Sequence, residues 1–224
     1  MKLILCGARG KMGSAISNAV IGSDKFDIVC RVDKIGGDGV YTDICDFNGK
    51  ADVIVDFSNH DATLSLLSYA LYKKIPLVIG TTAHTEKELS MISSASKDIP
   101  IIISENYSLW IYEIIKATRS IMKNGKYRIE IIECHAKSKR DMPSGTALMI
   151  KKELCEYSFA DVKIISLRAD TDIVYHKIAL ICDDERVELI HKVFDRSLFA
   201  RGALRASEFI ANKQNGIYEM GDII

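Results

Sequence analysis

Apolar and polar positions follow two different rhythms along this chain, and the change between them falls near residue 126. In the first hundred residues, short runs that are apolar on both faces alternate with stretches whose apolar residues recur at helical spacing. Strands are predicted at 1–6, 26–33, 51–58, 75–82 and 99–104, and helices at 14–23, 60–74 and 85–97. Apolar strands that alternate with helices indicate an α/β domain with a parallel sheet.

The second half has longer strand-like runs and fewer helices. Strands are predicted at 127–137, 162–169, 173–182 and 186–194, and helices at 145–155 and 197–214. The short acidic link Asp183-Asp184 between the last two strands is typical of an antiparallel hairpin. We therefore expect a second domain of α+β type, with a mixed, mainly antiparallel sheet and one helix across it.

The composition is that of an ordinary globular protein and gives no sign of a nucleic-acid or membrane partner. The 224 residues carry 30 Lys and Arg against 30 Asp and Glu, so bulk charge predicts neither nucleic-acid nor membrane binding. Apolar runs stay below the roughly 18 residues of a membrane span, and the short N-terminal run is unlike a signal peptide. Six scattered cysteines without a C-x-x-C pair favour buried thiols, no metal site and a cytoplasmic location.

A glycine-rich turn follows the first predicted strand and opens the first helix. In Gly7-Ala-Arg-Gly10-Lys-Met-Gly13, the first glycine permits a tight turn, and Gly10 lets the backbone approach a pyrophosphate. Gly13 lets the helix pack against the sheet, and Arg9 and Lys11 add positive charge. Because strand, turn and helix occur in this order, the turn favours a Rossmann-like domain that binds a dinucleotide over a glycine loop without a ligand.

An acidic residue ends the second predicted strand, where a Rossmann-like domain binds the ribose hydroxyls. Asp33 fits that role, but Lys34 follows it and could contact a 2′-phosphate, so NAD and NADP both remain open. The third and fourth strands end in 55–58 and 79–82, whose small residues would let a nicotinamide ring approach the backbone.

The stretch ECHAKSKRDMPSGTA at 133–147 contains a histidine, several basic residues and a predicted helix N-terminus within fifteen residues. Ser144 is a predicted helix N-cap, and the N–H groups of Gly145 and Thr146 in the first turn would bind a carboxylate. Lys139 adds a positive charge, and His135 is suited to donating a proton near neutral pH. The stretch therefore predicts a receptor for a small polyanionic substrate with one proton donor.

This stretch resembles the signature E-x-H-H-x-x-K-x-D-A-P-S-G-T-A of the 4-hydroxy-tetrahydrodipicolinate reductase (dihydrodipicolinate reductase) family. Further segments follow the same family in order, so that the resemblance covers essentially the whole chain. These segments are GARGKMG, VDFS, GTT, SENYS, DRSLFARGALRA and GIYEMGDII.

The resemblance implies a function and an assembly. The family reduces a cyclic dicarboxylate in the diaminopimelate route to lysine with NADH or NADPH, and its members form homotetramers. It implies a dinucleotide-binding Rossmann domain at 1–106 and 205–224, and a substrate-binding and oligomerisation domain at 107–204. Hydride would pass from the nicotinamide to ring C4 of the dehydrated substrate, and His135 would supply the proton.

Roles for single residues also follow from the resemblance. His135 matches the general acid and Lys139 the catalytic and substrate-binding lysine, while Arg196 and Phe199 match residues that close near the site. Substrate-binding positions are Ser144, Gly145 and Thr146. Coenzyme positions are Gly7, Arg9, Gly10, Lys11, Met12, Asp33, Lys34, Phe57, Gly80, Thr82 and Asn106.

The chain departs from the family pattern near the substrate and the nicotinamide. Ala136 replaces a second histidine, Met142 an alanine, and Ala83 and Trp110 each a glycine, while 168–172 replaces a glycine-rich segment. Two alternatives therefore stand beside the reductase: a nucleotide-binding homologue with weak or lost catalysis, and a dehydrogenase of another small dicarboxylate.

Overall fold

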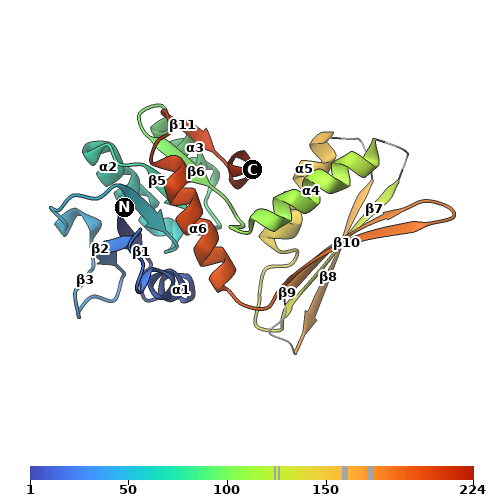
Figure 1. The fold of residues 1–224 in the computed structure, drawn as a ribbon, viewed down its shortest axis with the longest axis horizontal. Helices are drawn as coiled ribbons and strands as arrows, with labels where there is room; N and C mark the ends of the chain where they lie inside the picture. Colours follow the sequence, from blue (N-terminus) through green and yellow to red (C-terminus); the bar gives the residue numbers. More distant parts are fainter. Residues whose placement is uncertain (124, 126, 158–160, 171–173) are drawn as a thin grey trace. The chain divides into compact units, whose positions relative to one another are not determined.

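The computed structural model describes residues 1–224 except 124, 126, 158–160 and 171–173. The chain divides into two compact units, residues 1–107 with 196–224 and residues 108–195. Each unit has its own sheet (Figure 1). The sequence predicts a return to the first unit at residue 205, which lies inside helix α6 (Ser197–Ile210). The whole helix belongs to the first unit because it packs against that unit's sheet.

The first unit is built on a seven-stranded sheet in the order β11-β6-β5-β4-β1-β2-β3, and every pairing is parallel. Without β11, this is the strand order of a Rossmann fold, whose direction of winding reverses between β1 and β4. The strands are β1 Lys2–Cys6, β2 Asp27–Val32, β3 Val40–Tyr41, β4 Val53–Asp56, β5 Leu77–Ile79, β6 Pro100–Ile103 and β11 Gly216–Tyr218.

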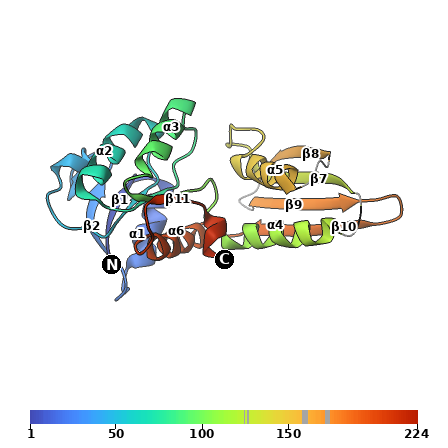
Figure 2. The same ribbon diagram turned by 90° about the horizontal axis from the view of Figure 1, so that it is seen from above.

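Helices cover both faces of this sheet, as Figure 2 shows. Helices α2 (Thr63–Lys73) and α3 (Glu86–Ala95) pack together on one face, where Leu66 and Ile92 meet strand residues such as Ile4. Helices α1 (Lys11–Val20) and α6 pack together on the other face. Strand residues are buried toward both faces, which explains the continuous apolar runs in the sequence. Short 3₁₀ turns lie at Ile44–Asp46, His60–Ala62 and Met220–Ile223.

The second unit carries a four-stranded sheet in the order β10-β9-β7-β8. Strand β7 (Arg128–Ala136) pairs in parallel with β8 (Val162–Ala169) and antiparallel with β9 (Val174–Ile181). Strands β9 and β10 (Arg186–Val193) form the predicted antiparallel hairpin. Ile173, predicted to begin β9, and residues 171–172 of the substituted segment lie outside the described residues.

Two helices pack on this sheet, so the prediction of a single helix is wrong. Helix α5 (Gly145–Tyr157) crosses between the parallel strands β7 and β8, while α4 (Leu109–Met122) contacts β10 and α5. The helix at 109–122 was not predicted, although Ile111, Tyr112 and Ile115 repeat at helical spacing and are buried. Among the described residues, no helix is both long and apolar enough to cross a membrane.

Candidate active site

The glycine turn of the first unit has no room for side chains at two of its three glycines. Gly7 has a φ of +74°, and a Cβ atom there would lie 2.3 Å from the carbonyl oxygen of Phe57. A Cβ atom at Gly13 would lie 2.1 Å from the carbonyl oxygen of Gly7. Gly10 is the N-cap of α1 and places no side chain over the N–H groups of the first turn. The turn is therefore shaped to receive an anion at a helix N-terminus.

Asp33 and Arg9 are both held by the backbone around this turn. The carboxylate of Asp33 accepts hydrogen bonds from the backbone N–H of Arg9 (2.9 Å) and of Ile35 (3.3 Å). The guanidinium of Arg9 donates to the carbonyl oxygens of Ile35 and Gly37, at 2.9 Å each. Asp33 thus lies just after β2, as predicted. Arg9, predicted to lie beside the phosphates, instead holds the loop after β2 through its hydrogen bonds.

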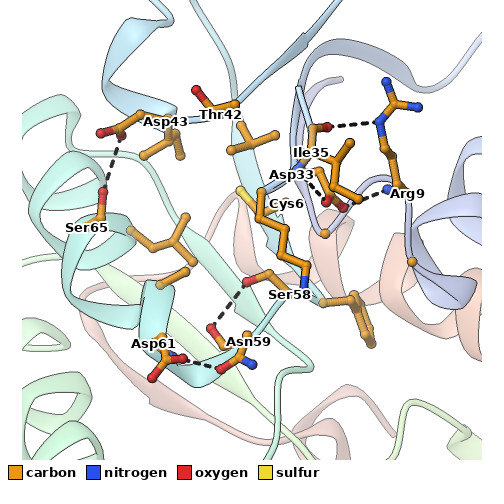
Figure 3. A pocket seen from close by; sticks show the side chains of 18 residues that line it. Cys6, Arg9, Asp33, Ile35, Thr42, Asp43, Ser58, Asn59, Asp61 and Ser65 are labelled. Carbon is orange, nitrogen blue, oxygen red and sulfur yellow. Dashed lines mark hydrogen bonds between the residues drawn. The ribbon is translucent and has the colours of Figure 1, made fainter. Parts of the chain in front are cut away.

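A cavity of about 720 Å³ opens between this turn and helix α2 (Figure 3). Its volume lies within the range of pockets that bind cofactors. It is lined by Cys6, Gly7, Arg9, Gly10, Val32, Asp33, Lys34, Ile35, Thr42, Asp43, Ile44, Phe57, Ser58, Asn59, Asp61, Ala62, Ser65 and Leu66. The cavity lies beyond the carboxyl ends of β1, β2 and β4, where open α/β sheets bind their ligands.

A buried carboxylate organises the rim of this cavity. Asp56 accepts hydrogen bonds from the hydroxyls of Ser58 (2.5 Å) and Thr81 (2.7 Å), which fixes the ends of β4 and β5 relative to each other. Burial raises the pKa of Asp56, and these two hydrogen bonds oppose the shift. At Gly80, a Cβ atom would lie 2.1 Å from the ring of Phe57, so the glycine leaves room for that ring.

The predicted coenzyme residues divide into those that line the cavity and those that lie elsewhere in the first unit. Gly7, Arg9, Gly10, Asp33, Lys34 and Phe57 line it. Lys11 and Met12 form the first turn of α1, Gly80 and Thr82 follow β5, and Asn106 is buried near the end of the unit. The lining residues from 42–44 and 59–66 were not predicted from the sequence, because their segments come together only through the tertiary fold.

In the second unit, a carboxylate and a histidine occupy alternate positions of β7 and so share one face of the strand. Glu133 is fully buried, and one of its oxygens is hydrogen-bonded to Nδ1 of His135. Both oxygens also accept hydrogen bonds from Arg168 of β8, at 3.0 Å each. Burial lowers the pKa of His135, Glu133 opposes this effect, and the charges of Lys139 and Arg168 reinforce it.

Lys139 lies in the turn that follows β7. The turn is closed by a hydrogen bond from the Lys139 N–H to the carbonyl oxygen of Ala136 (3.0 Å), and the Lys139 ammonium pairs with Asp141 at 2.8 Å. Ala136, where the family has a second histidine, ends the strand opposite Ala169 of β8. Because side chains alternate along a strand, Ala136 points away from the face that carries His135.

Ser144 caps helix α5, as predicted. Its hydroxyl oxygen accepts a hydrogen bond from the N–H of Ala147 (3.3 Å), and it also contacts Nε2 of His176 at 3.2 Å. Gly145 and Thr146 follow in the first helical turn, half-buried, where backbone N–H groups point out of the helix end. The second unit therefore brings a histidine, a lysine and a helix N-terminus to one end of its parallel strands.

His176 is a member of this cluster that the sequence analysis missed. Its ring stands edge-on to that of His135, with centroids 5.2 Å apart, and burial holds its pKa at about 3, so it is neutral. One donor atom each from Glu133, His135 and His176 lie within 4.8 Å of one another, a grouping that could hold a metal ion. The guanidinium of Arg168 sits on both Glu133 oxygens and repels a cation there, so proton handling suits the cluster better.

Two other predicted residues lie in the first unit. Arg196 is exposed and is the N-cap of α6, and Phe199 lies half-buried in the first turn of that helix. Both fall within the range 107–204 predicted for the substrate-binding domain. They belong with the coenzyme unit because α6 packs on its sheet.

Comparison with known protein families matches both units. Residues 1–107 match the N-terminal domain of dihydrodipicolinate reductase, and residues 109–224 match the C-terminal domain. The chain belongs to the dihydrodipicolinate reductase family. Similar curated members are the 4-hydroxy-tetrahydrodipicolinate reductases of Caldanaerobacter subterraneus subsp. tengcongensis and Clostridium novyi. Each is 34% identical over 246 aligned residues, which cover 100% of this chain and 98% of the relative.

Solved structures agree with this membership at the level of the fold. A dipicolinate-bound dihydrodipicolinate reductase from Paenisporosarcina sp. TG-14 aligns with a TM-score of 0.78 at 18% identity, covering 100% of this chain and 99% of the other. The diaminopimelate dehydrogenase of C. glutamicum aligns with a TM-score of 0.65 at 10% identity, covering 99% and 93%. The two-unit architecture is thus shared by dehydrogenases beyond the family.

Proposed function

We propose that this chain is a 4-hydroxy-tetrahydrodipicolinate reductase, which forms tetrahydrodipicolinate with NADH or NADPH in the diaminopimelate route to lysine. The observation that carries the proposal is the cluster of His135, Lys139 and the α5 N-terminus in a family member matched over its whole length. A bound nicotinamide would supply hydride to ring C4 of the dehydrated substrate. The Gly7–Gly13 turn and the adjoining cavity fit a dinucleotide, because a Cβ atom would fill the turn.

The residues of the second unit provide the rest of the chemistry. Lys139 and the first turn of α5 bind the two substrate carboxylates, one through a point charge and the other through backbone N–H groups. His135 donates a proton from Nε2 to the reduced substrate, since its Nδ1 is held by Glu133. Positioning and charge stabilisation supply much of the rate acceleration.

The test is NAD(P)H oxidation in the presence of the condensation product of pyruvate and aspartate semialdehyde. His135→Ala and Lys139→Ala should each lower kcat/KM by about 10²-fold or more while leaving NADH binding intact, because loss of a general acid or a fixed charge has effects of this order. Lys152→Ala is the matched control, since Lys152 is an exposed lysine of α5 paired with Glu156.

Three other outcomes would each decide against part of the proposal. Wild-type turnover in both variants would remove His135 and Lys139 from the mechanism. Tight NADH binding without turnover in the wild-type protein would favour the nucleotide-binding homologue. Turnover with a different dicarboxylate alone would favour the other dehydrogenase.

We also propose that the chain forms a homotetramer through the second unit. The helices of this unit cover the sheet face that carries the buried residues Ile131 and Ile178. By strand alternation, a set of large apolar side chains lies on the other face, which we call the open face. It consists of Ile132, Ile165, Leu167, Tyr175 and Ile190, each half-buried or exposed in the single chain.

We further propose that the enzyme works in the cytoplasm. Its six cysteines are free thiols, two of them exposed, which suits a reducing compartment. Fractionation of the native cells is the direct measurement.

A further inference from the structure

Glu133 is a fully buried carboxylate whose oxygens are contacted by several hydrogen-bond donors. Arg168 donates to both of its oxygens at 3.0 Å, and Ser166 of β8 and His135 also bond to it. Burial raises the pKa of Glu133, but these hydrogen bonds outweigh burial and hold the pKa below its usual value. Glu133 is therefore ionised at neutral pH.

An ionised carboxylate can only accept hydrogen bonds, which decides how His135 is oriented. Because Glu133 contacts Nδ1 of His135, that nitrogen carries a proton and donates it to the carboxylate. Nε2 is then the nitrogen left to face a substrate. The two residues are two positions apart on β7, so the strand itself sets their separation.

Arg168 connects this pair to the turn that carries Lys139. Besides its bonds to Glu133, its guanidinium donates to the carbonyl oxygens of Lys139 (3.3 Å) and Asp141 (2.5 Å). The side chain of Arg168 is largely buried, with an exposure of 11%. One side chain thus holds both the carboxylate behind His135 and the backbone of the Lys139 turn.

The charges around His135 oppose one another. Burial and the positive charges of Lys139 and Arg168 disfavour the imidazolium, and Glu133 favours it. The groups that face or couple to His135 come from β7, β8, β9, β10 and the turn before α5. They are Glu133, Arg168, His176, Lys139 and Asp141, and His191 of β10 acts through its coupling to His176.

We propose that Glu133 is the positioning residue of the reaction, and that Arg168 fixes Glu133 in turn. Glu133 directs Nε2 of His135 toward the substrate and stabilises the imidazolium that donates the proton. The proton passes from Nε2 to the reduced substrate and is replaced from water, while Glu133 stays ionised throughout. This inference rests on the proposed function, in which His135 is the proton donor.

The variant Glu133→Gln keeps the size of the side chain and removes its charge. We expect kcat to fall by about 10²-fold with KM changed only a few-fold, because ground-state binding is left in place. The alkaline limb of the kcat/KM profile should move to lower pH by about one unit or more, since an imidazolium without its carboxylate loses its proton earlier. Glu133→Asp, which keeps the charge, should retain the wild-type position of that limb.

Glu153→Gln is the matched structural control. Glu153 is a half-buried carboxylate of α5 that pairs with Arg119 at 2.5 Å, so its loss removes a comparable ion pair from the same unit. This variant should lower stability and leave the pH profile in place. A Glu133→Gln enzyme with the wild-type kcat and pH profile would overturn the inference, as would an equal shift in Glu153→Gln.

A readout independent of turnover separates this inference from the proposed function. NMR titration of the His135 ring, assigned against His135→Ala, should show that it loses its proton at lower pH in Glu133→Gln than in the wild-type protein. If the wild-type protein lacks reductase activity but the titration shifts, the proposed function fails and the coupling stands. If the wild-type enzyme is active but His135 titrates at the same pH in Glu133→Gln, the proposed coupling of Glu133 to His135 is wrong. If Glu133→Gln does not fold, Glu133→Asp is titrated instead: the His135 ring should then lose its proton at the wild-type pH, and a displaced titration or pH limb would overturn the inference.

Discussion

Ala83 has a strained backbone conformation that should lower the stability of the protein. It follows β5 with a φ of +64°, in the left-handed region, where the family pattern has a glycine. A Cβ atom makes that region unfavourable by roughly 1–2 kcal/mol. The strain lies beside Gly80 and Thr82, two predicted coenzyme residues, in the segment that should approach the nicotinamide.

Ala83→Gly should therefore stabilise the protein, although the gain is partly offset by the greater freedom of glycine in the unfolded chain. We expect a net gain of about 0.5–1 kcal/mol, the difference between the two effects. A higher urea midpoint at an unchanged m-value is the measurement. Ala211→Gly is the control, since Ala211 has a φ of −57° and should gain nothing. A urea midpoint for Ala83→Gly below that of the wild-type protein would contradict the claim that Ala83 is strained.

Helix α3 is an element whose start depends on one carboxylate. Thr85 is its N-cap and Glu88 completes a capping box, with hydrogen bonds to Glu88 from the Thr85 N–H (2.6 Å) and hydroxyl (2.9 Å). His60 approaches the other Glu88 oxygen at 3.1 Å. The backbone bond from Thr85, followed by the His60 interaction, lowers the pKa of Glu88 to about 2.

This shift makes the stability contribution of Glu88 depend on pH in a defined direction. A lowered pKa in the folded state means that the contribution is complete above the unfolded value of 4.5 and is lost as pH falls toward about 2. The stability difference between the wild-type protein and Glu88→Gln should therefore shrink across that interval, as followed by urea midpoints. Glu86→Gln, in the same helical turn but outside the capping box, should show no such trend. A constant difference between wild type and Glu88→Gln would refute the assignment.

In the proposed function, coenzyme binding and substrate chemistry fall to two separate units of the molecule. The first unit carries the dinucleotide turn and the cavity, and the second carries His135, Lys139 and the α5 N-terminus. This division explains why substitutions in the second unit should affect turnover and leave coenzyme binding in place. The open face of the second sheet carries the exposed apolar residues on which the proposed tetramer depends.

Disrupting the open face should break the proposed tetramer. Leu167 and Ile190 are 42% and 46% exposed, on β8 and β10, and the double variant Leu167→Glu with Ile190→Glu would place charges on both edges of that face. Light scattering at micromolar concentration should give a tetramer for the wild-type protein and smaller species for the variant. Ile21→Glu, at an exposed residue of the first unit, should remain tetrameric. A monomeric wild-type protein would contradict the proposal.

Local features of the sequence were sufficient for the elements and for the residues that are close together in the chain. The glycine turn, the Ser144 cap and the β9–β10 hairpin were all predicted, because each depends on short-range sterics or hydrogen bonding. The α/β class followed from the period of the apolar residues. Helix α4 was missed, although its apolar spacing is helical and Ser108 stands at its N-cap.

Contacts between distant segments were decided by the tertiary structure alone. Arg168 reaches Glu133 because β8 pairs with β7 in a register that no local pattern encodes, and His176 joins them through the antiparallel pairing of β9. Likewise, the cavity of the first unit takes eight of its eighteen lining residues from 42–44 and 59–66, which the fold brings beside the glycine turn. The sequence by itself therefore determined the family, the strands and the reactive groups, since these are set by local chemistry. Only the register of the folded sheet decided that Arg168 and His176 lie beside the Glu133–His135 pair.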